Sequence, residues 1–159
     1  MVYFEGSCDT IEESILIEAE RIADVLGGEK VLKREIRSLA ELAAIVKHGL
    51  PKSTLRVVVS HLQSDTHATS QLMDRLVPKA TYKRRKSVLS PAESERIERL
   101  ARVIATAEYI WDDPEAARQF LQTPHPLLEQ QTPCDAAMTE LGARQVEEIL
   151  WKIFYGLPA

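Results

Sequence analysis

Apolar residues recur every three or four positions along most of the chain, a period typical of amphipathic helices. The longest stripe follows Ser90, and its members are Ile97, Leu100, Ala101, Ile104, Ala107 and Trp111. Ser90 is a favourable N-cap, Pro91 suits the first helical position, and Glu93 completes a capping box three residues after the cap. The pattern therefore predicts one long helix over residues 90–111.

Shorter helices are predicted before this one, over residues 9–26, 38–48, 51–62, 67–76 and 79–86. The run Val57–Val59 is also compatible with a strand, but its neighbourhood has helical spacing and offers no strand partner. Gly27 and Gly28 are expected to end the first helix. We expect residues 30–37 to form a basic connector.

After residue 111 the pattern predicts helices that begin near Pro114 and Thr132, and a last helix after Gly142. Gly142 is expected to break or turn the chain, and residues 155–159 to form an exposed tail. We find no convincing strand pattern. The predicted fold class is therefore all-α, with three parts: an acidic N-terminal helix (1–29), a helix-turn-helix region (30–89) and a helical C-terminal domain (90–159).

Charge is distributed unevenly, although the formal net charge is only −4. Residues 1–29 carry a net charge of −7, residues 30–86 carry +9, and residues 87–159 carry −6. A basic segment within an acidic chain favours a polyanionic partner for that segment alone. The alternative is that these cations only solvate a helical surface.

The cations concentrate in the short helix predicted over residues 79–86. Two helices precede it, and the turn at Val77–Pro78 is tight, which is the pattern of a helix-turn-helix. In that motif the last helix enters the major groove of DNA, and its cations bind phosphates. The predicted DNA contacts are Lys79, Thr81, Lys83, Arg84, Arg85 and Lys86, with Tyr82 facing the core. A motif kept only for dimerisation or for contacts with another protein is the alternative.

Other functional classes lack support in the sequence. The chain has no HExxH, GxSxG or GxGxxG motif and no phosphate-binding loop, so we expect no enzyme activity, no cofactor and no metal site. Cys8 and Cys134 are expected to be free thiols in a reducing compartment. No apolar run is long enough to span a membrane. We therefore expect a cytoplasmic protein without a membrane partner.

The junction around residues 77–102 resembles that of a known family. It holds a Pro-x-x-Thr-x-x-Arg-Arg helix, then Leu-Ser-x-x-Glu-Ser, then an arginine-rich helix. The matching residues are Pro78, Thr81, Arg84, Arg85, Leu89, Ser90, Glu93, Ser94, Arg99, Leu100 and Arg102, followed later by Phe120–Leu121, Thr132–Pro133, Thr139–Gly142, Val146 and Tyr155–Gly156. This series resembles the Xre/MbcA/ParS antitoxins of bacterial toxin–antitoxin pairs, over roughly the last 110 residues.

The resemblance implies a C-terminal toxin-binding domain and, as its partner, a RES-type toxin that consumes NAD. It also implies that the complex represses its own operon. An acidic segment with apolar anchors suits a cationic NAD pocket. The predicted toxin contacts are Glu140, Glu147, Trp151, Tyr155, Gly156, Leu157 and Pro158. For Trp151 the alternative is a place in the core of its own domain.

Two positions depart from the family pattern. Phe120 replaces the usual tryptophan, and the loop over residues 125–130 has Glu129 and Gln130 where the family has two glycines. We therefore expect this loop not to use positive φ angles there. We also predict a homodimer that binds an inverted repeat of operator DNA and packs through the stripe of residues 90–111. The rival hypothesis is a stand-alone dimeric transcription regulator whose C-terminal domain binds something else.

Overall fold

The described part of the protein is built from helices. The structure is a computed structural model that describes residues 18–159. After a helix over residues 18–25, its elements are α2 (Gly28–Leu32), α3 (Leu39–His48), α4 (Thr54–Ser60), α5 (Thr66–Leu76), α6 (Lys79–Arg84), α7 (Pro91–Trp111), α8 (Pro114–Gln122), the 3₁₀ turn η1 (Pro126–Leu128), α9 (Pro133–Ala136) and α10 (Glu140–Phe154). An isolated antiparallel bridge pairs Pro51 with Val88. The predicted all-α fold class is confirmed.

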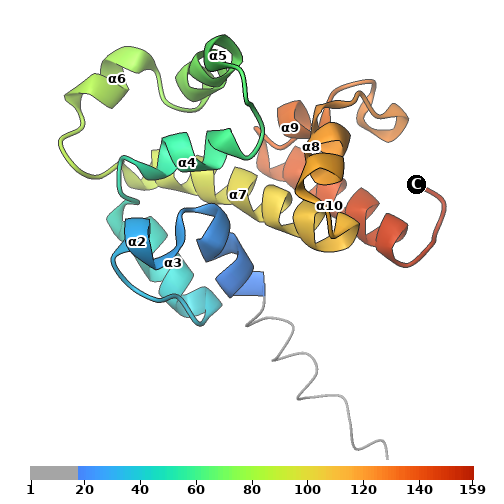
Figure 1. Ribbon diagram of the computed structural model, residues 1–159, viewed down its shortest axis with the longest axis horizontal. Helices are drawn as coiled ribbons and strands as arrows, with labels where there is room; N and C mark the ends of the chain where they lie inside the picture. Colours follow the sequence, from blue (N-terminus) through green and yellow to red (C-terminus); the bar gives the residue numbers. More distant parts are fainter. Residues whose placement is uncertain (1–17) are drawn as a thin grey trace, which may run out of the picture.

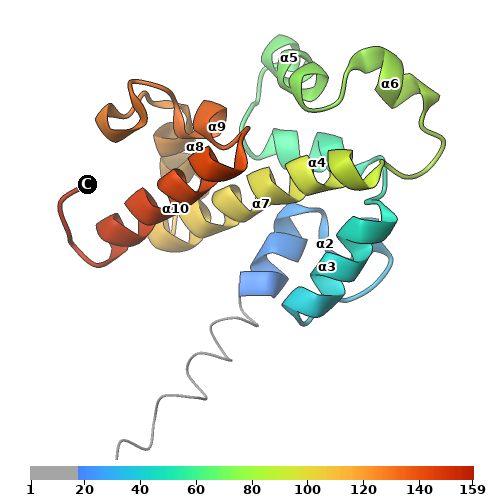
Figure 2. The ribbon, with the colours of Figure 1, turned by 180° about the vertical axis from the view of Figure 1, so that it is seen from behind.

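Helix α7 is the element on which the others pack. Figures 1 and 2 show it running through the middle of the molecule, with α3 and α4 beside its first half and α8 and α10 beside its second half. Its start is determined locally, because Ser90 Oγ accepts a hydrogen bond from Glu93 N while Glu93 Oε2 accepts one from Ser90 N at 2.8 Å. The predicted capping box and helix are confirmed.

The apolar stripe of α7 is buried inside the protein. Ile97, Leu100, Ala101, Ile104 and Ala107 are each at most 1 % exposed, and only the last member, Trp111, reaches 39 %. The stripe packs against the neighbouring helices of the same chain. The prediction that it serves as the surface for a second copy is therefore wrong.

Helices α4, α5 and α6 form the predicted helix-turn-helix arrangement. Val57–Val59 lies within α4, so the helical interpretation of this run is confirmed. Helix α5 begins at a cap in which Asp65 accepts a hydrogen bond from Ala68 N at 2.8 Å. Only Val77 and Pro78 separate α5 from α6, which makes the tight turn of the motif.

The N-terminal region differs from its prediction. Of the helix expected over residues 9–26, residues 9–17 lie outside the described part, and the rest is helical to residue 25. Gly27 then has a φ of 112°, which ends the helix. Helix α2 replaces the first half of the connector expected over residues 30–37, because Leu32 and Ile36 are buried and anchor this segment on the core.

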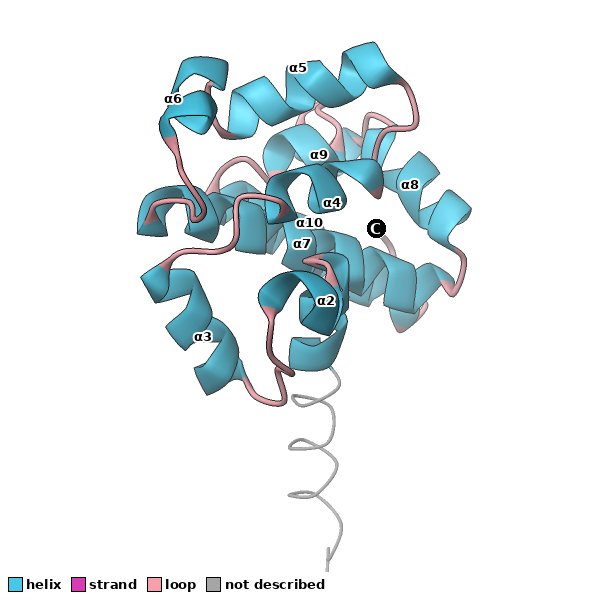
Figure 3. Cartoon of the chain, turned by 60° about the vertical axis from the view of Figure 1, so that its left-hand side comes forward, coloured by secondary structure: helices cyan, strands magenta, loops and turns pink. Residues whose placement is uncertain are grey.

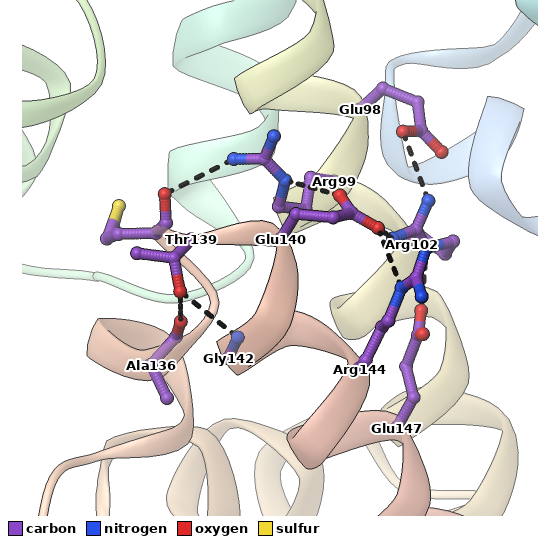
Figure 4. A network of polar contacts seen from close by, with 10 residues as sticks. Glu98, Arg99, Arg102, Ala136, Thr139, Glu140, Gly142, Arg144 and Glu147 are labelled. Atoms are coloured by element: carbon purple, nitrogen blue, oxygen red, sulfur yellow. Dashed lines mark hydrogen bonds and ion pairs between the residues drawn. The ribbon is translucent and has the colours of Figure 1, made fainter.

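Gly142 does not break the chain, contrary to the prediction. It lies in the first turn of α10, where its N–H donates to Thr139 Oγ1 at 3.0 Å (Figure 4). A Cβ at this position would lie 1.9 Å from the carbonyl oxygen of Ala136. Glycine is needed here because the end of α9 approaches the start of α10 closely.

The loop over residues 125–130 was also predicted incorrectly. Glu129 and Gln130 have φ angles of 53° and 63°, so the loop uses positive φ without glycine. The chain is closed there by hydrogen bonds from His125 N to Gln131 O at 3.0 Å and from Gln130 N to His125 O at 3.2 Å. These bonds hold two L-residues in a conformation that is unfavourable for them.

Candidate functional site

The predicted DNA contacts lie together on α6 and the segment that follows it. None of the residues of α6 is buried. Thr81 is half-buried, and its Oγ1 accepts a hydrogen bond from Arg84 Nη2 at 3.3 Å. The exposed cations are Lys79, Lys83, Arg84 and Lys86. The helix thus presents most of its positive charge to solvent, as a DNA-recognition helix must.

Arg85 differs from these cations because its guanidinium is paired with a carboxylate of the same chain. Its Nε and Nη2 donate to the two carboxylate oxygens of Glu93 at 3.0 and 2.7 Å. This hydrogen bonding from Arg85 holds the pKa of Glu93 below its ordinary value. Since Glu93 also closes the cap of α7, Arg85 joins the end of α6 to the start of α7. A DNA phosphate would have to compete with Glu93 for Nε and Nη2 of Arg85.

Further contacts hold α6 from its inner side. Tyr82 packs against the hydrophobic core, as predicted, and Lys52 Nζ lies 4.4 Å from the centre of its ring. Lys52 Nζ also donates to the carbonyl oxygen of Arg85 at 3.1 Å. At the start of α6, Lys79 N donates to Asp74 Oδ1 at 2.6 Å. The exposed cations are therefore carried by a helix that is held at both ends.

A groove of about 400 Å³ lies between α4, α5 and α6. Lys52, just before α4, and Arg56, within it, line this groove together with Lys79 and Lys83 of α6. Sequence reasoning missed Lys52 and Arg56 as candidate DNA contacts. Both residues belong to the basic segment, which was a weak indication of DNA binding. Their closeness to α6 could not be predicted, because it depends on how α4 and α5 pack.

Two predicted toxin contacts, Glu140 and Glu147, belong to an ion-pair network between α7 and α10 (Figure 4). Arg99 Nε donates to Glu140 Oε2 at 2.9 Å, and Arg102 Nε donates to Glu147 Oε1 at 2.6 Å. Arg102 and Arg144 also pair with Glu140. The hydrogen bond from Arg99 holds the pKa of Glu140 below its ordinary value. Both carboxylates thus join α10 to α7, and an arginine of another protein would have to share them.

The other predicted toxin contacts surround an aromatic cluster near the end of α10. The cluster consists of Tyr109, Trp151, Phe154 and Tyr155, whose neighbouring ring centres are 5.2 to 6.3 Å apart. Phe154 is 47 % exposed and Tyr155 is 69 % exposed, whereas Trp151 is half-buried. Trp151 therefore forms the less exposed part of an open aromatic surface.

Residues 155–159 continue from this cluster. Gly156 has a φ of 65°, its N–H donates to Ile153 O at 3.1 Å, and Leu157 N donates to Lys152 O at 2.8 Å. These two bonds form a Schellman motif, which ends the helix and turns the chain. Leu157 is 56 % exposed, and Pro158 is exposed as well. The segment therefore extends the open surface beside the aromatic cluster.

Residues 18–159 hold neither a candidate metal site nor a reactive thiol. The described side chains include no group of His, Cys, Asp and Glu suited to a metal ion. Cys134 is a buried free thiol whose pKa is raised by burial to about 12, so it is inert at neutral pH; Cys8 lies outside the described residues. Across the same range, no helix has the length and apolar character needed to cross a membrane.

These features define a helix-turn-helix protein whose second helical domain exposes an aromatic surface. Comparison with known families agrees with this class. Residues 41–102 match the antitoxin Xre-like helix-turn-helix domain, and residues 106–156 match the antitoxin Xre/MbcA/ParS C-terminal toxin-binding domain. The chain belongs to the Xre/MbcA/ParS antitoxin family, as the resemblance predicted, and neither of its domains is of an enzymatic type.

A curated relative is similar to part of the chain. Antitoxin Xre from Pseudomonas putida is 33 % identical over 86 residues, which is 52 % of this chain and 54 % of that protein. The chain thus spans about half the length of the curated relative that it matches.

Proposed function

We propose that this protein is the antitoxin of a type II toxin–antitoxin pair, which blocks a RES-type, NAD-consuming toxin and represses its own operon. The observation that carries the proposal is the separation of two exposed surfaces. The cationic α6 lies near the start of α7 (Figures 1 and 2), while the aromatic cluster lies at the other end of α7, where Tyr109 meets the last turns of α10. One chain can therefore bind DNA and a protein partner at the same time.

For DNA binding, α6 enters the major groove with its exposed cations and Thr81 toward the duplex. Lysine and arginine contacts to phosphates make the affinity salt-dependent through counterion release. Lys52 and Arg56 add cations beside α6. Arg85 acts mainly by holding α6 in place, since its Nε and Nη2 already donate to the carboxylate of Glu93.

The test of this half is the double variant Lys83→Ala/Arg84→Ala, titrated against a duplex that carries the promoter region of the protein's own gene. Each lost contact should cost about 1–3 kcal/mol of binding free energy, and the dependence on salt should become shallower. The matched control is Lys33→Ala/Arg34→Ala, which removes the same charge from another exposed site. Equal affinities of the α6 variant and the wild type would refute the assignment of α6.

For toxin binding, we place the contact on the aromatic cluster and residues 155–159. A pocket that binds the phosphates of NAD must be cationic, and residues 87–159 carry a net charge of −6. Exposed aromatic and aliphatic side chains are the usual anchors of such a contact. Tyr155 and Leu157 are the most exposed of them, at 69 % and 56 %.

This half is tested by co-expressing the toxin with the variant Tyr155→Ser/Leu157→Ser. Growth and cellular NAD should fall, because loss of interface anchors costs about 2 kcal/mol or more of binding free energy. The control variant Leu39→Ser/Leu127→Ser removes two apolar side chains of similar exposure, 43 % and 52 %, elsewhere on the surface. Removal of residues 155–159 is the stricter version of the experiment. Full protection by both altered proteins would exclude this surface from toxin blocking.

A homodimer that binds an inverted repeat is part of the proposal. Helix α6 has 6 residues and reaches few base edges, so a two-fold arrangement supplies the remaining specificity. A monomeric mass at micromolar concentration, both free and on DNA, would contradict it. Purification of the protein from its native host distinguishes an antitoxin from a stand-alone regulator. An antitoxin should copurify with the product of a neighbouring toxin gene, and a stand-alone regulator should not.

A further inference from the structure

Helix α5 carries α6 into position, yet few apolar side chains hold it. Among its 11 residues only Leu72 and Leu76 are buried, and they lie four positions apart on one line of the helix. Met73 and, on α6, Tyr82 are only partly buried. A helix held along one line can roll about that line. The polar contacts at its two ends therefore decide its orientation.

The segment just before α5 is held by α8 of the C-terminal domain. Arg118 donates from Nε to His61 O at 3.0 Å and from Nη1 to Ser64 Oγ at 3.2 Å. Gln122, one turn farther along α8, donates to the carbonyl oxygen of Leu62. The connection between the end of α4 and the start of α5 is thus bound to a helix whose contacting residues are more than fifty positions away in the sequence.

The far end of α5 is bound to α9 and α7. Arg75 Nη1 lies 2.8 Å from Asp135 Oδ1, and Arg96 Nη1 donates to the carbonyl oxygen of Leu76 at 3.4 Å. Figure 3 shows α5 lying above α9 and α4. Arg75 and Asp135 are 53 % and 43 % exposed, so their pair adds little to overall stability. Its location suits a different role, which is to stop α5 from rolling.

We propose that Arg118 and Asp135, two residues of the toxin-binding domain, position the helix-turn-helix for DNA binding. This inference rests on the proposed function of α6. Because only Val77 and Pro78 lie between the two helices, a roll of α5 moves α6 and the cations that it presents. Two positioning residues on α8 and α9, distant from the cationic surface, thus control the affinity for operator DNA.

Charge reversal of the Arg75–Asp135 pair gives the sharpest test, again with the promoter duplex and the full chain. Asp135→Arg adds positive charge, which by itself tightens DNA binding, yet we expect binding about fivefold weaker because repulsion from Arg75 displaces α5. Arg75→Asp should be similarly weak. The double variant Arg75→Asp/Asp135→Arg should regain wild-type affinity. A double variant as weak as Arg75→Asp would instead mean that Arg75 contacts DNA directly, and would overturn the positioning role of Asp135.

The second test separates Arg118 from other arginines of the same domain. Arg118→Gln should weaken operator binding. Arg144→Gln is the control: it also removes an ion pair, from a side chain that is 70 % exposed, and should leave operator binding unchanged. Arg118→Lys, which keeps one donor, should recover part of the affinity. Thermal unfolding should show each variant folded at the assay temperature. Wild-type affinity in both Asp135→Arg and Arg118→Gln would overturn the inference and leave DNA binding by α6 intact. A wild-type protein that does not bind the duplex would overturn the proposed function as well.

Discussion

Replacing Gly142 by alanine is a test in which helix propensity and packing predict opposite changes in the free energy of unfolding. In an isolated helix, replacing glycine by alanine stabilises by about 0.5–1 kcal/mol, because alanine loses less backbone entropy. In this protein a Cβ would lie 1.9 Å from Ala136 O, 2.7 Å from Ala136 C and 2.9 Å from Thr139 Oγ1. The two closest atoms belong to the backbone, so no side-chain rotation relieves the clash.

The magnitude follows from the movement that Gly142→Ala requires. To reach ordinary contact at 3.4 Å, α9 and α10 must separate by about 1.5 Å. This disturbs the Thr139 cap, worth about 1 kcal/mol, and the packing around the fully buried Ala143, with a cost of about 1–3 kcal/mol for overpacking. After the gain in propensity is subtracted, we expect a loss of about 1–3.5 kcal/mol. The midpoint of thermal unfolding should fall by about 2–14 °C.

Urea unfolding followed by far-ultraviolet circular dichroism measures this loss. Gly156→Ala is the matched control, because no atom lies within 4 Å of its Cβ position and only its φ of 65° opposes alanine. It should cost about 1 kcal/mol. If Gly142→Ala were as stable as the wild type or more stable, propensity would outweigh packing, and the close approach of α9 to α10 would be refuted.

Two further predictions concern strain and charge. Replacing Glu129 or Gln130 by glycine should raise the free energy of unfolding by about 1 kcal/mol each, since their φ angles of 53° and 63° strain an L-residue; a lowered thermal midpoint would contradict this. Glu93→Gln should destabilise the protein most near neutral pH. Hydrogen bonding from Arg85 lowers the pKa of Glu93 below 4.5, so the carboxylate stabilises the fold above pH 4.5, and this contribution is lost as the pH falls through the folded-state pKa. The unfolding curves of wild type and variant should therefore converge on acidification, and a difference independent of pH would argue against the ion pair.

Helix starts were predictable because the side chain of an N-cap residue bonds to a backbone N–H only two or three residues farther along the chain. Ser90 and Glu93 form the expected capping box, and Ser38 accepts from Glu41 N as its spacing suggests. The run Val57–Val59 was assigned correctly for the same reason, since its helical period is a local property. The family resemblance also depended on the sequence alone.

The role of a glycine or a loop residue was decided by the tertiary structure. Gly142 was expected to break or turn the chain, but it lies within α10, and the carbonyl group of Ala136 approaches it so closely that no Cβ fits. Glu129 and Gln130 adopt positive φ because hydrogen bonds close their loop from both sides. Propensity describes the conformational preference of a residue by itself. The conformation at these three positions depends instead on atoms that other segments bring close to them.

At the candidate site, the charged residues can be read from the sequence, but helix packing controls which of them are available to a partner. Lys83 and Arg84 are exposed as the cationic pattern predicts. Arg85 is instead bound to Glu93, and Glu147 is bound to Arg102, which is 45 positions away in the chain. Hydrophobic period and caps depend on neighbours along a helix, whereas the partner of a charged side chain depends on which helices pack together. The packing of α10 on α7 is fixed only when the whole core forms. The surface that remains available to DNA and toxin is therefore fixed at the same stage.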